Sequence, residues 1–357
     1  MVKNWPCPGA GSVLPVVGSV LRKNWRPALV LAVNLLLVFV CRQAVLEQPA
    51  PDYNLKLQAA QQAAAAQKLI GPRLLGEEYT FITTTLGSPA AKHLAAHPDF
   101  AAVAVDMLDR AGVRKGDKVA VNMSGSFPAL NIAVLAAVHS IGAEPVITSS
   151  IGASTWGANR PDFTWPDMEA QLARAGLWPY RSAAVSLGGG ADNGGGLPPE
   201  GITLARQAAQ RSGRMFLDSQ SVDDAIAKRL ALYKAANHGA LPAALINVGG
   251  NQVIFGAPGH TAFLRQGLTI GYRPSLAKNH GLAAAFVNAQ RPVLHFLNIE
   301  RLAAAYGIRE QTPVGQSRVY FIQVVPNAVR VIILGWLVFM ALVLYRGQTK
   351  GWWRWAD

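Results

Sequence analysis

Cysteine is almost absent from this chain of 357 residues. Its two cysteines, Cys7 and Cys41, both lie near the amino terminus, so residues 42–357 contain no disulfide of their own and no thiolate metal site. Charge is also scarce. Charged residues make up 15% of the chain and hydrophobic residues 51%, whereas soluble domains carry about 25% charged residues. The composition therefore favours a membrane protein or a large buried core.

Several motifs of cofactor and metal sites are missing as well. The glycine-rich stretch SLGGGADNGGGLPPEG (186–201) has no following Gly-Lys-Ser/Thr, so it is not a Walker A loop, and it does not match the Rossmann fingerprint. His93 and His97 are four residues apart, but no acid is placed as in a zinc-binding helix. We therefore expect no metal site and no bound cofactor.

The net charge of +13 suggests nucleic-acid binding, but its distribution argues against it. Residues 1–42 and 330–357 together carry nine basic residues and one acid, whereas residues 43–329 have an excess of only five basic residues. The charge is concentrated beside the two most apolar segments. This arrangement indicates membrane topology, and we expect no nucleic-acid partner.

The two apolar segments are PALVLAVNLLLVFVC (27–41) and VIILGWLVFMALVLY (331–345). Each reaches the ~20 residues needed to cross a bilayer only if flanking residues are included. Basic residues precede the first segment and follow the second, which predicts that both termini are cytoplasmic. A signal peptide for the first segment, and a buried core helix for the second, are the alternatives.

The predicted organisation places the protein in the inner or plasma membrane, with its main domain periplasmic or extracellular. The expected parts are a cytoplasmic amino terminus (1–26), a transmembrane anchor (27–46), a helical linker (47–76), an external α/β domain (77–325), a transmembrane helix (326–345) and a cytoplasmic tail (346–357).

Strands and helices alternate through the middle of the chain. The pattern predicts a strand at 118–121, a helix at 128–141 and a strand in EPVITSS (144–150), which is a β-α-β unit. Later strands are followed by helices in the same way, so the fold class is α/β with a mostly parallel sheet. Four of the strands end in turns rich in Ser, Gly or Asn. Since ligands of such sheets bind beyond the carboxyl ends of the strands, we expect these turns to gather at a site.

The stretch NMSGSFPALN (122–131) forms the first of these turns. Ser124 or Ser126 could act as a nucleophile at a strand-to-helix elbow, with His260 or His280 as base, although the first glycine of G-x-S-x-G is missing. The free N–H groups of the helix start could instead bind an anion. In a third interpretation, Ser126 simply caps the helix.

Further ligand-binding candidates come from the other turns and from the long segment TSSIGASTWGANRPDFTWPDME (148–169), which has no clear period and is expected to be a functional loop. Arg160 could hold a carboxylate through two hydrogen bonds. The candidate ligand-binding residues are Asn122, Ser149, Ser150, Asn159, Arg160, Asp162, Asp192, Asn193 and Asn251.

The string from NMSGSFPALN through WPDME, with GGGADNGGG and INVGGN downstream, resembles the poly-γ-glutamate system protein family. The resemblance covers about residues 75–325. It implies a membrane-anchored accessory protein that makes or exports a poly-γ-glutamate capsule or released polymer. Its partners would be the polymer or the synthase complex. The alternative is a serine-type hydrolase or transferase acting on the polymer's γ-amide bonds, so the sequence leaves open whether the protein is an enzyme.

Residues 112–148 are also similar to an early β-α-β unit of adenylate-forming ligases, but the phosphate loop of that family is missing. We interpret this similarity as shared α/β architecture. A nucleotide-using ligase would also conflict with the predicted external location.

Overall fold

The computed structural model describes residues 25–256, 264–271 and 280–350. The chain divides into two units, one formed by residues 49–321 and the other by residues 1–48 together with 322–357. Each unit is described by itself.

The larger unit is built on a seven-stranded sheet with the order β11-β12-β10-β3-β4-β8-β9. All neighbouring strands pair in parallel except β11, which is antiparallel to β12. The prediction of an α/β fold with a mostly parallel sheet is therefore confirmed. The strands are β3 (Lys118–Met123), β4 (Glu144–Ser150), β8 (Ala184–Ser186), β9 (Met215–Phe216), β10 (Ala244–Val248), β11 (Gly267–Thr269) and β12 (Val293–Phe296).

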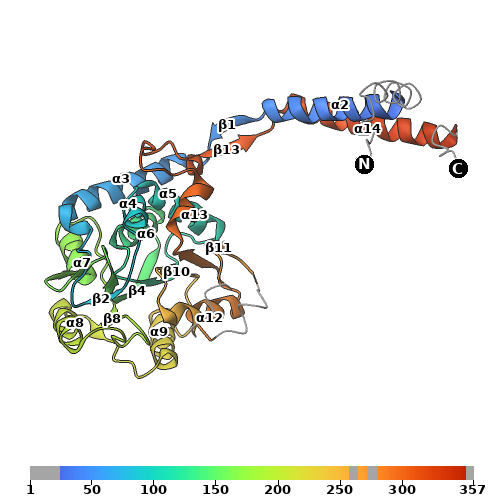
Figure 1. The fold of residues 1–357 in the computed structure, drawn as a ribbon. Helices are drawn as coiled ribbons and strands as arrows, with labels where there is room; N and C mark the ends of the chain where they lie inside the picture. Colours follow the sequence, from blue (N-terminus) through green and yellow to red (C-terminus); the bar gives the residue numbers. More distant parts are fainter. Residues whose placement is uncertain (1–24, 257–263, 272–279, 351–357) are drawn as a thin grey trace, which may run out of the picture. The chain divides into compact units, whose positions relative to one another are not determined.

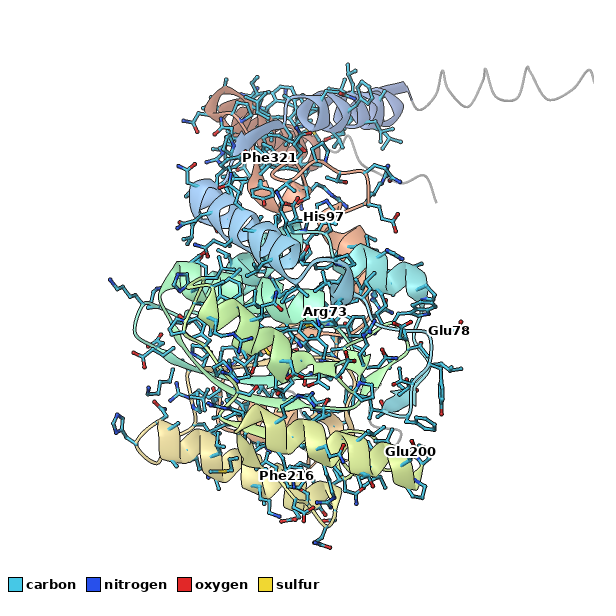
Figure 2. The ribbon with its side chains drawn as sticks, turned by 90° about the vertical axis from the view of Figure 1, so that its left-hand side faces the viewer. Arg73, Glu78, His97, Glu200, Phe216 and Phe321 are labelled. Atoms are coloured by element: carbon cyan, nitrogen blue, oxygen red, sulfur yellow. The ribbon has the colours of Figure 1, made fainter. Side chains whose placement is uncertain are left out.

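Helices cover both faces of this sheet (Figures 1 and 2). The core on one face contains side chains of α3 (Tyr53–Ile70), α4 (Pro89–Ala95), α5 (Asp99–Arg110), α6 (Pro128–Ile141), α7 (Trp165–Arg174) and α13 (Ile299–Tyr306), with α3 packed on α5 and α6. The other face packs against α8 (Pro199–Ser212), α9 (Val222–Ala236), α10 (Gln252–Phe255) and α12 (Leu282–Asn288).

Side chains of the central strands alternate between these two layers. In β3, Val119 and Val121 join the core beneath α5 and α6, whereas Ala120 joins the core beneath α9 and α12. This period of two, with the apolar Val119, Ala120 and Val121 buried in succession, is what a strand buried on both faces requires. Helix α3, which the sequence places in a linker, buries Ala59, Ala63 and Ala66 in the first of these cores.

Several helix boundaries agree with the sequence. Helix α6 spans the predicted 128–141, Ser221 caps α9 through a hydrogen bond from Asp224 N, and α13 lies between its predicted caps Asn298 and Gly307. Ser126 is not the cap of α6, because Phe127 occupies that position. The interpretation of Ser126 as an N-cap is therefore wrong.

The segment 148–169 is more ordered than a long loop. It contains the short strand β5 (Ala153–Ser154), which pairs with β2 (Thr83–Thr85). It also contains β6 (Asn159–Arg160) and β7 (Phe163–Thr164), which pair with each other. Helix α7 then begins, with Thr164 and Asp167 in a capping box. The absence of a period in this segment reflects strands too short to show one.

The smaller unit contains helices α2 (Trp25–Gln43) and α14 (Asn327–Thr349), and strand β1 (Leu46–Pro49) pairs with β13 (Phe321–Val324) at its boundary. Trp336 Nε1 of α14 donates a hydrogen bond of 3.0 Å to Asn34 Oδ1 of α2, so the two helices lie side by side (Figure 1). Among the described residues, only α14 is long and apolar enough to cross a membrane, while the apolar part of α2, Val30–Phe39, is shorter.

Candidate functional site

The order of the strands places a switch point between β3 and β10. After β3 the chain adds β4, β8 and β9 on one side, and it then returns to add β10 and β12 on the other. The two strands pair as far as Met123 and Val248, and a hydrogen bond of 3.0 Å from Ser124 N to Val248 O follows directly. Ligands of open α/β sheets bind at such a point.

A cavity of about 420 Å³ lies at this position. Its walls come from the turns that follow β3, β4, β8, β10 and β12, and from β2 and the residues after it. The lining consists of hydroxyl side chains, glycine backbone, the amides of Asn251 and Gln252, and the apolar Leu86, Phe127 and Leu297. The residues that line it include no acidic side chain. The expected gathering of strand-end turns is thus present.

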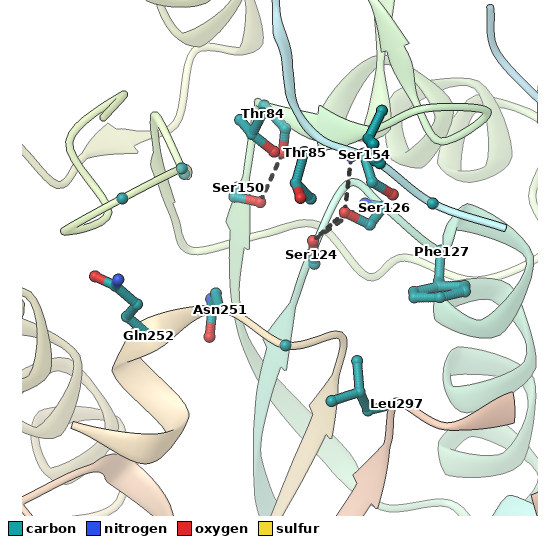
Figure 3. Close-up of a pocket in the computed structure, with 17 residues that line it drawn as sticks. Thr84, Thr85, Ser124, Ser126, Phe127, Ser150, Ser154, Asn251, Gln252 and Leu297 are labelled. Carbon is teal, nitrogen blue, oxygen red and sulfur yellow. Dashed lines mark hydrogen bonds between the residues drawn. The ribbon is translucent and has the colours of Figure 1, made fainter. Parts of the chain in front are cut away.

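Serine hydroxyls meet on one wall of the cavity (Figure 3). Ser124 Oγ donates a hydrogen bond of 3.0 Å to Ser126 Oγ, and Ser126 Oγ also accepts one of 2.9 Å from Ser154 N. Ser150 Oγ accepts a bond from Gly125 N and donates one to Gly152 O. Neighbouring backbone therefore holds these side chains in place.

Glycine permits the close approach of the turns after β3 and β10. Gly249 has a φ of +95°, and a Cβ atom there would lie 2.6 Å from Ser124 Cβ. A side chain at this position would be strained and would also displace Ser124. The close approach of Ser124 therefore explains why Gly249, the first glycine of INVGGN, has no side chain.

Lys92 of α4 contacts two of the serines that line the cavity, Ser126 and Ser154. It is 2% exposed, and its Nζ donates a hydrogen bond of 2.7 Å to Ser154 Oγ and another to Ser126 O. The Nζ also lies 3.8 Å from the centre of the Phe127 ring. Burial lowers the pKa of Lys92 to about 7, because the charged form loses its hydration.

A second polar cluster lies within the sheet next to the cavity. Arg229 of α9 is fully buried, and its Nη1 lies 2.7 Å from Asp192 Oδ2. Arg229 also donates hydrogen bonds to Ser186 Oγ (2.9 Å) and Asn122 Oδ1 (3.2 Å). Asp192 adopts a φ of +61°, and the ion pair fixes this left-handed turn of the glycine-rich loop. We call Arg229, Asp192, Ser186 and Asn122 the arginine cluster.

The arginine cluster continues across the sheet to β12. Asn122 Nδ2 donates to Asn247 Oδ1 (2.7 Å) and Asn251 Oδ1 (3.2 Å), and Asn247 Nδ2 lies 3.0 Å from His295 Nδ1. Burial lowers the pKa of His295 to about 4, so this histidine is neutral at pH 7. The connected polar side chains from Arg229 to His295 therefore contain one charged pair, Arg229 and Asp192, and they link Asn251 of the cavity lining to the core.

The structure sorts the predicted site residues into two groups. Ser124, Ser126, Ser150 and Asn251 line the cavity. The other predicted residues do not line it. Asn122 and Asp192 belong to the arginine cluster, and Ser149 contacts Ser182. Asn159 forms hydrogen bonds with Glu77 and Thr83, Arg160 forms ion pairs with Glu77 and with the predicted Asp162, and Asn193 is exposed.

The structure adds residues that the sequence did not single out, namely Lys92, Ser154, Thr84, Thr85 and Gln252. Ser154 lies within the segment 148–169, which the sequence predicts to be functional. His280 is exposed and does not line the cavity, and His260 lies outside the described residues. No three His, Cys, Asp or Glu side chains gather as metal ligands in the described part of the chain.

No protein-family model matches the chain, and no curated protein matches it. Among solved structures, the chain is similar to diaminopropionate ammonia lyase from Escherichia coli. The apo form is 11% identical over 71% of this chain and 69% of that chain, with a TM-score of 0.17. The form in complex with D-serine is 11% identical over 71% and 65%, with a TM-score of 0.16. A likeness this low carries no argument about fold or function.

Proposed function

We propose that this protein is a membrane-anchored accessory protein of poly-γ-glutamate synthesis or export, and that its strand-end cavity binds a stretch of the polymer. One observation carries the binding proposal. The cavity at the switch point is lined by hydroxyls, amides and glycine backbone, with no carboxylate among its lining residues.

This lining suits the chemistry of a γ-linked glutamate chain. Each repeat carries an amide and a free carboxylate. The amide needs donors and acceptors, which Asn251, Gln252 and the serine hydroxyls supply. A lining without acids spares the carboxylates like-charge repulsion. The volume of about 420 Å³ falls in the range of small-ligand sites, roughly 300–1,000 Å³.

The rim of the cavity offers a direct test of binding. Leu86 lines the cavity and is 87% exposed, so Leu86→Asp adds a carboxylate without disturbing the core. Met215, which is 62% exposed on β9 and does not line the cavity, provides a matched control as Met215→Asp.

Binding would be measured by calorimetry on the full chain in detergent, with oligomers of γ-linked glutamate as the ligand. Repulsion of about 1 kcal/mol at short range in water predicts roughly fivefold weaker binding for Leu86→Asp at low salt. Met215→Asp should bind like the wild type. Equal affinity in both variants would contradict binding at this cavity.

The membrane part of the proposal consists of two spans, α14 and the segment 27–46, which overlaps α2. Both helices expose large apolar side chains, such as Leu31 and Leu35 in α2 and Leu334 and Val338 in α14. Hydrogen bonds such as Trp336 to Asn34 also occur between paired transmembrane helices. These observations support two paired spans, and the basic residues that precede the first and follow the second support the proposal that both termini are cytoplasmic and the larger unit external.

Reporter fusions test this topology. A phosphatase reporter fused after Asp357 should be inactive, because that enzyme folds only outside the cytoplasm, whereas a fluorescent reporter at the same position should be active. Activity of the phosphatase would exclude the two-span arrangement.

The serine hydroxyls that line the cavity raise a second function, a hydrolase or transferase acting on the polymer's γ-amide bonds, for which the sequence suggests Ser124 or Ser126 as nucleophile. Ser124→Ala and Ser126→Ala separate the two functions in cells. Loss of cell-associated polymer with unchanged chain length supports the accessory role. A changed chain length, with activity in the purified protein, supports the enzyme.

A further inference from the structure

Lys92 differs from ordinary buried lysines because no acid neutralises it. None of the ion pairs between described residues includes Lys92. Its Nζ contacts only oxygen atoms of Ser126 and Ser154 and the face of Phe127. A buried ammonium with so few partners is costly, so the neutral amine is readily reached near pH 7.

A neutral lysine amine has two N–H bonds and one lone pair. At this site an N–H can donate to Ser126 O, while the lone pair accepts the hydroxyl proton of Ser154 across the same 2.7 Å. This is the contact that a base makes with a serine nucleophile.

We propose that Ser154 and Lys92 form a nucleophile–base pair that attacks a carbonyl carbon of the chain bound in the cavity. The inference rests on the proposed function, since the γ-amide of the bound polymer is the substrate class. It also moves the reactive hydroxyl from Ser124 and Ser126, which the sequence suggests, to Ser154.

The positions of the three serines favour Ser154. Ser154 lines the cavity and directly contacts Lys92. Ser126 Oγ instead accepts two hydrogen bonds, from Ser124 Oγ and Ser154 N, and neither group is a base. In this arrangement Ser126 is a positioning residue that fixes the backbone of Ser154.

The surrounding backbone is shaped to hold this pair. A Cβ atom on Gly87 would lie 3.0 Å from Ser154 Oγ and 3.1 Å from Lys92 Cε, so the chain approaches both side chains closely there. Ser154 itself belongs to β5, which pairs with β2. Ser154 on β5 and Lys92 on α4 are therefore held by two elements, and the backbone at Gly87 lies close to both side chains.

The reaction balances without any further reagent than water. Neutral Lys92 takes the hydroxyl proton as Ser154 Oγ bonds to the amide carbon. The C–N bond then breaks, the Lys92 ammonium returns the proton to the leaving amine, and an acyl ester remains on Ser154. Water attacks this ester with Lys92 as base, releasing a carboxylic acid and restoring the hydroxyl. An amine acceptor in place of water would give transfer.

A fluorophosphonate probe tests the pair directly on the full chain in detergent. Tandem mass spectrometry should find the phosphonyl adduct on Ser154, and Ser154→Ala should abolish it. Lys92→Met should slow labelling about 100-fold, as for loss of a general base. Lys118→Met, at an ion pair on the surface, should label like the wild type. In the wild type the labelling rate should rise with pH through about 7, and Lys92→Met should lack this rise.

Two further measurements keep the result decisive. Ser154→Cys should react with iodoacetamide faster in the Lys92 background than in Lys92→Met, which tests the base even if one variant is unstable. Calorimetry of the wild type with γ-linked glutamate oligomers measures binding independently of the labelling. An unlabelled wild type, or an adduct on Ser124 or Ser126, overturns the catalytic pair while the binding function stands. Loss of binding in the wild type overturns the proposed function itself.

Discussion

Two buried cations lie near the carboxyl ends of the same sheet, and their surroundings differ. Arg229 is fully buried, but it has Asp192 at 2.7 Å and hydrogen bonds to Ser186, Asn122 and Ala225 O. Lys92 is 2% exposed and contacts only two serines and an aromatic ring. Arg229 lies beside the cavity, whereas Lys92 contacts the serines that line it.

The difference indicates two roles for buried charge. A paired guanidinium with its donors satisfied holds a shape, here the left-handed turn of the glycine-rich loop at Asp192. A lysine without an acid has a pKa near neutrality and can exchange its proton. Stability should therefore depend on Arg229, and reactivity on Lys92.

The largest expected effect comes from breaking the arginine cluster. Arg229→Met leaves Asp192 as an uncompensated buried charge, which should lower the free energy of unfolding by about 3–5 kcal/mol. Urea denaturation of the larger unit in the full chain measures this. The double variant Arg229→Met/Asp192→Asn should recover part of the loss. Equal stability of Arg229→Met and wild type would refute the structural role.

Lys92 should produce a smaller effect that depends on pH. Its pKa is about 7 when folded and 10.5 in the ordinary state, so the unfolded chain binds more protons between these values. The free energy of unfolding should then rise with pH in this window, by up to about 1.4 kcal/mol per unit. Denaturation curves at pH 7 and pH 9 should show the rise in the wild type and not in Lys92→Met. A rise of equal size in both would assign it to other groups.

The contrast between the two cations also shows which parts of the fold and the site can be predicted from the sequence. The parallel sheet follows from alternating apolar strands and helices, and the turns after β3 and β10 meet because parallel strands end at one edge. Ser124, Ser126, Ser150 and Asn251 could therefore be placed from their position after strands.

Lys92 could not be placed in this way. It lies on a short helix far from the strand ends in sequence, and no pattern around it distinguishes a buried amine from a surface lysine. The partners of Asp192 and Arg160 could not be predicted for a related reason, since pairing with Arg229 and Glu77 comes from tertiary contacts. Spacing reveals which residues follow a strand, but not which charges find partners.

Glu169 of α7 extends the comparison to a buried acid. Its carboxylate accepts hydrogen bonds of 2.8 Å from Ser182 N and Ser182 Oγ, and burial raises its pKa to about 7. The folded chain therefore binds more protons than the unfolded chain between pH 4.5 and 7, and this contribution to stability is lost as pH rises through that window. Denaturation at pH 5 and pH 7 should show a decline that is smaller in Glu169→Gln. An unchanged decline in the variant would exclude Glu169 as its source.

The smallest effect on stability should come from Gly87→Ala, although it alters the reactive pair. The new Cβ would lie 3.0–3.1 Å from Ser154 Oγ, Lys92 Cε and Thr155 O, so these atoms must shift by a few tenths of an ångström. The gain of about 0.4–1 kcal/mol from a stiffer unfolded chain should offset much of this strain.

Gly190→Ala, also at the cavity, meets no atom closer than 3.5 Å and is the matched control. Phosphonate labelling should slow several-fold in Gly87→Ala alone, with both melting temperatures near that of the wild type. Equal labelling in the two variants would mean that the spacing of Ser154 and Lys92 does not govern reactivity, because Gly87→Ala changes little else.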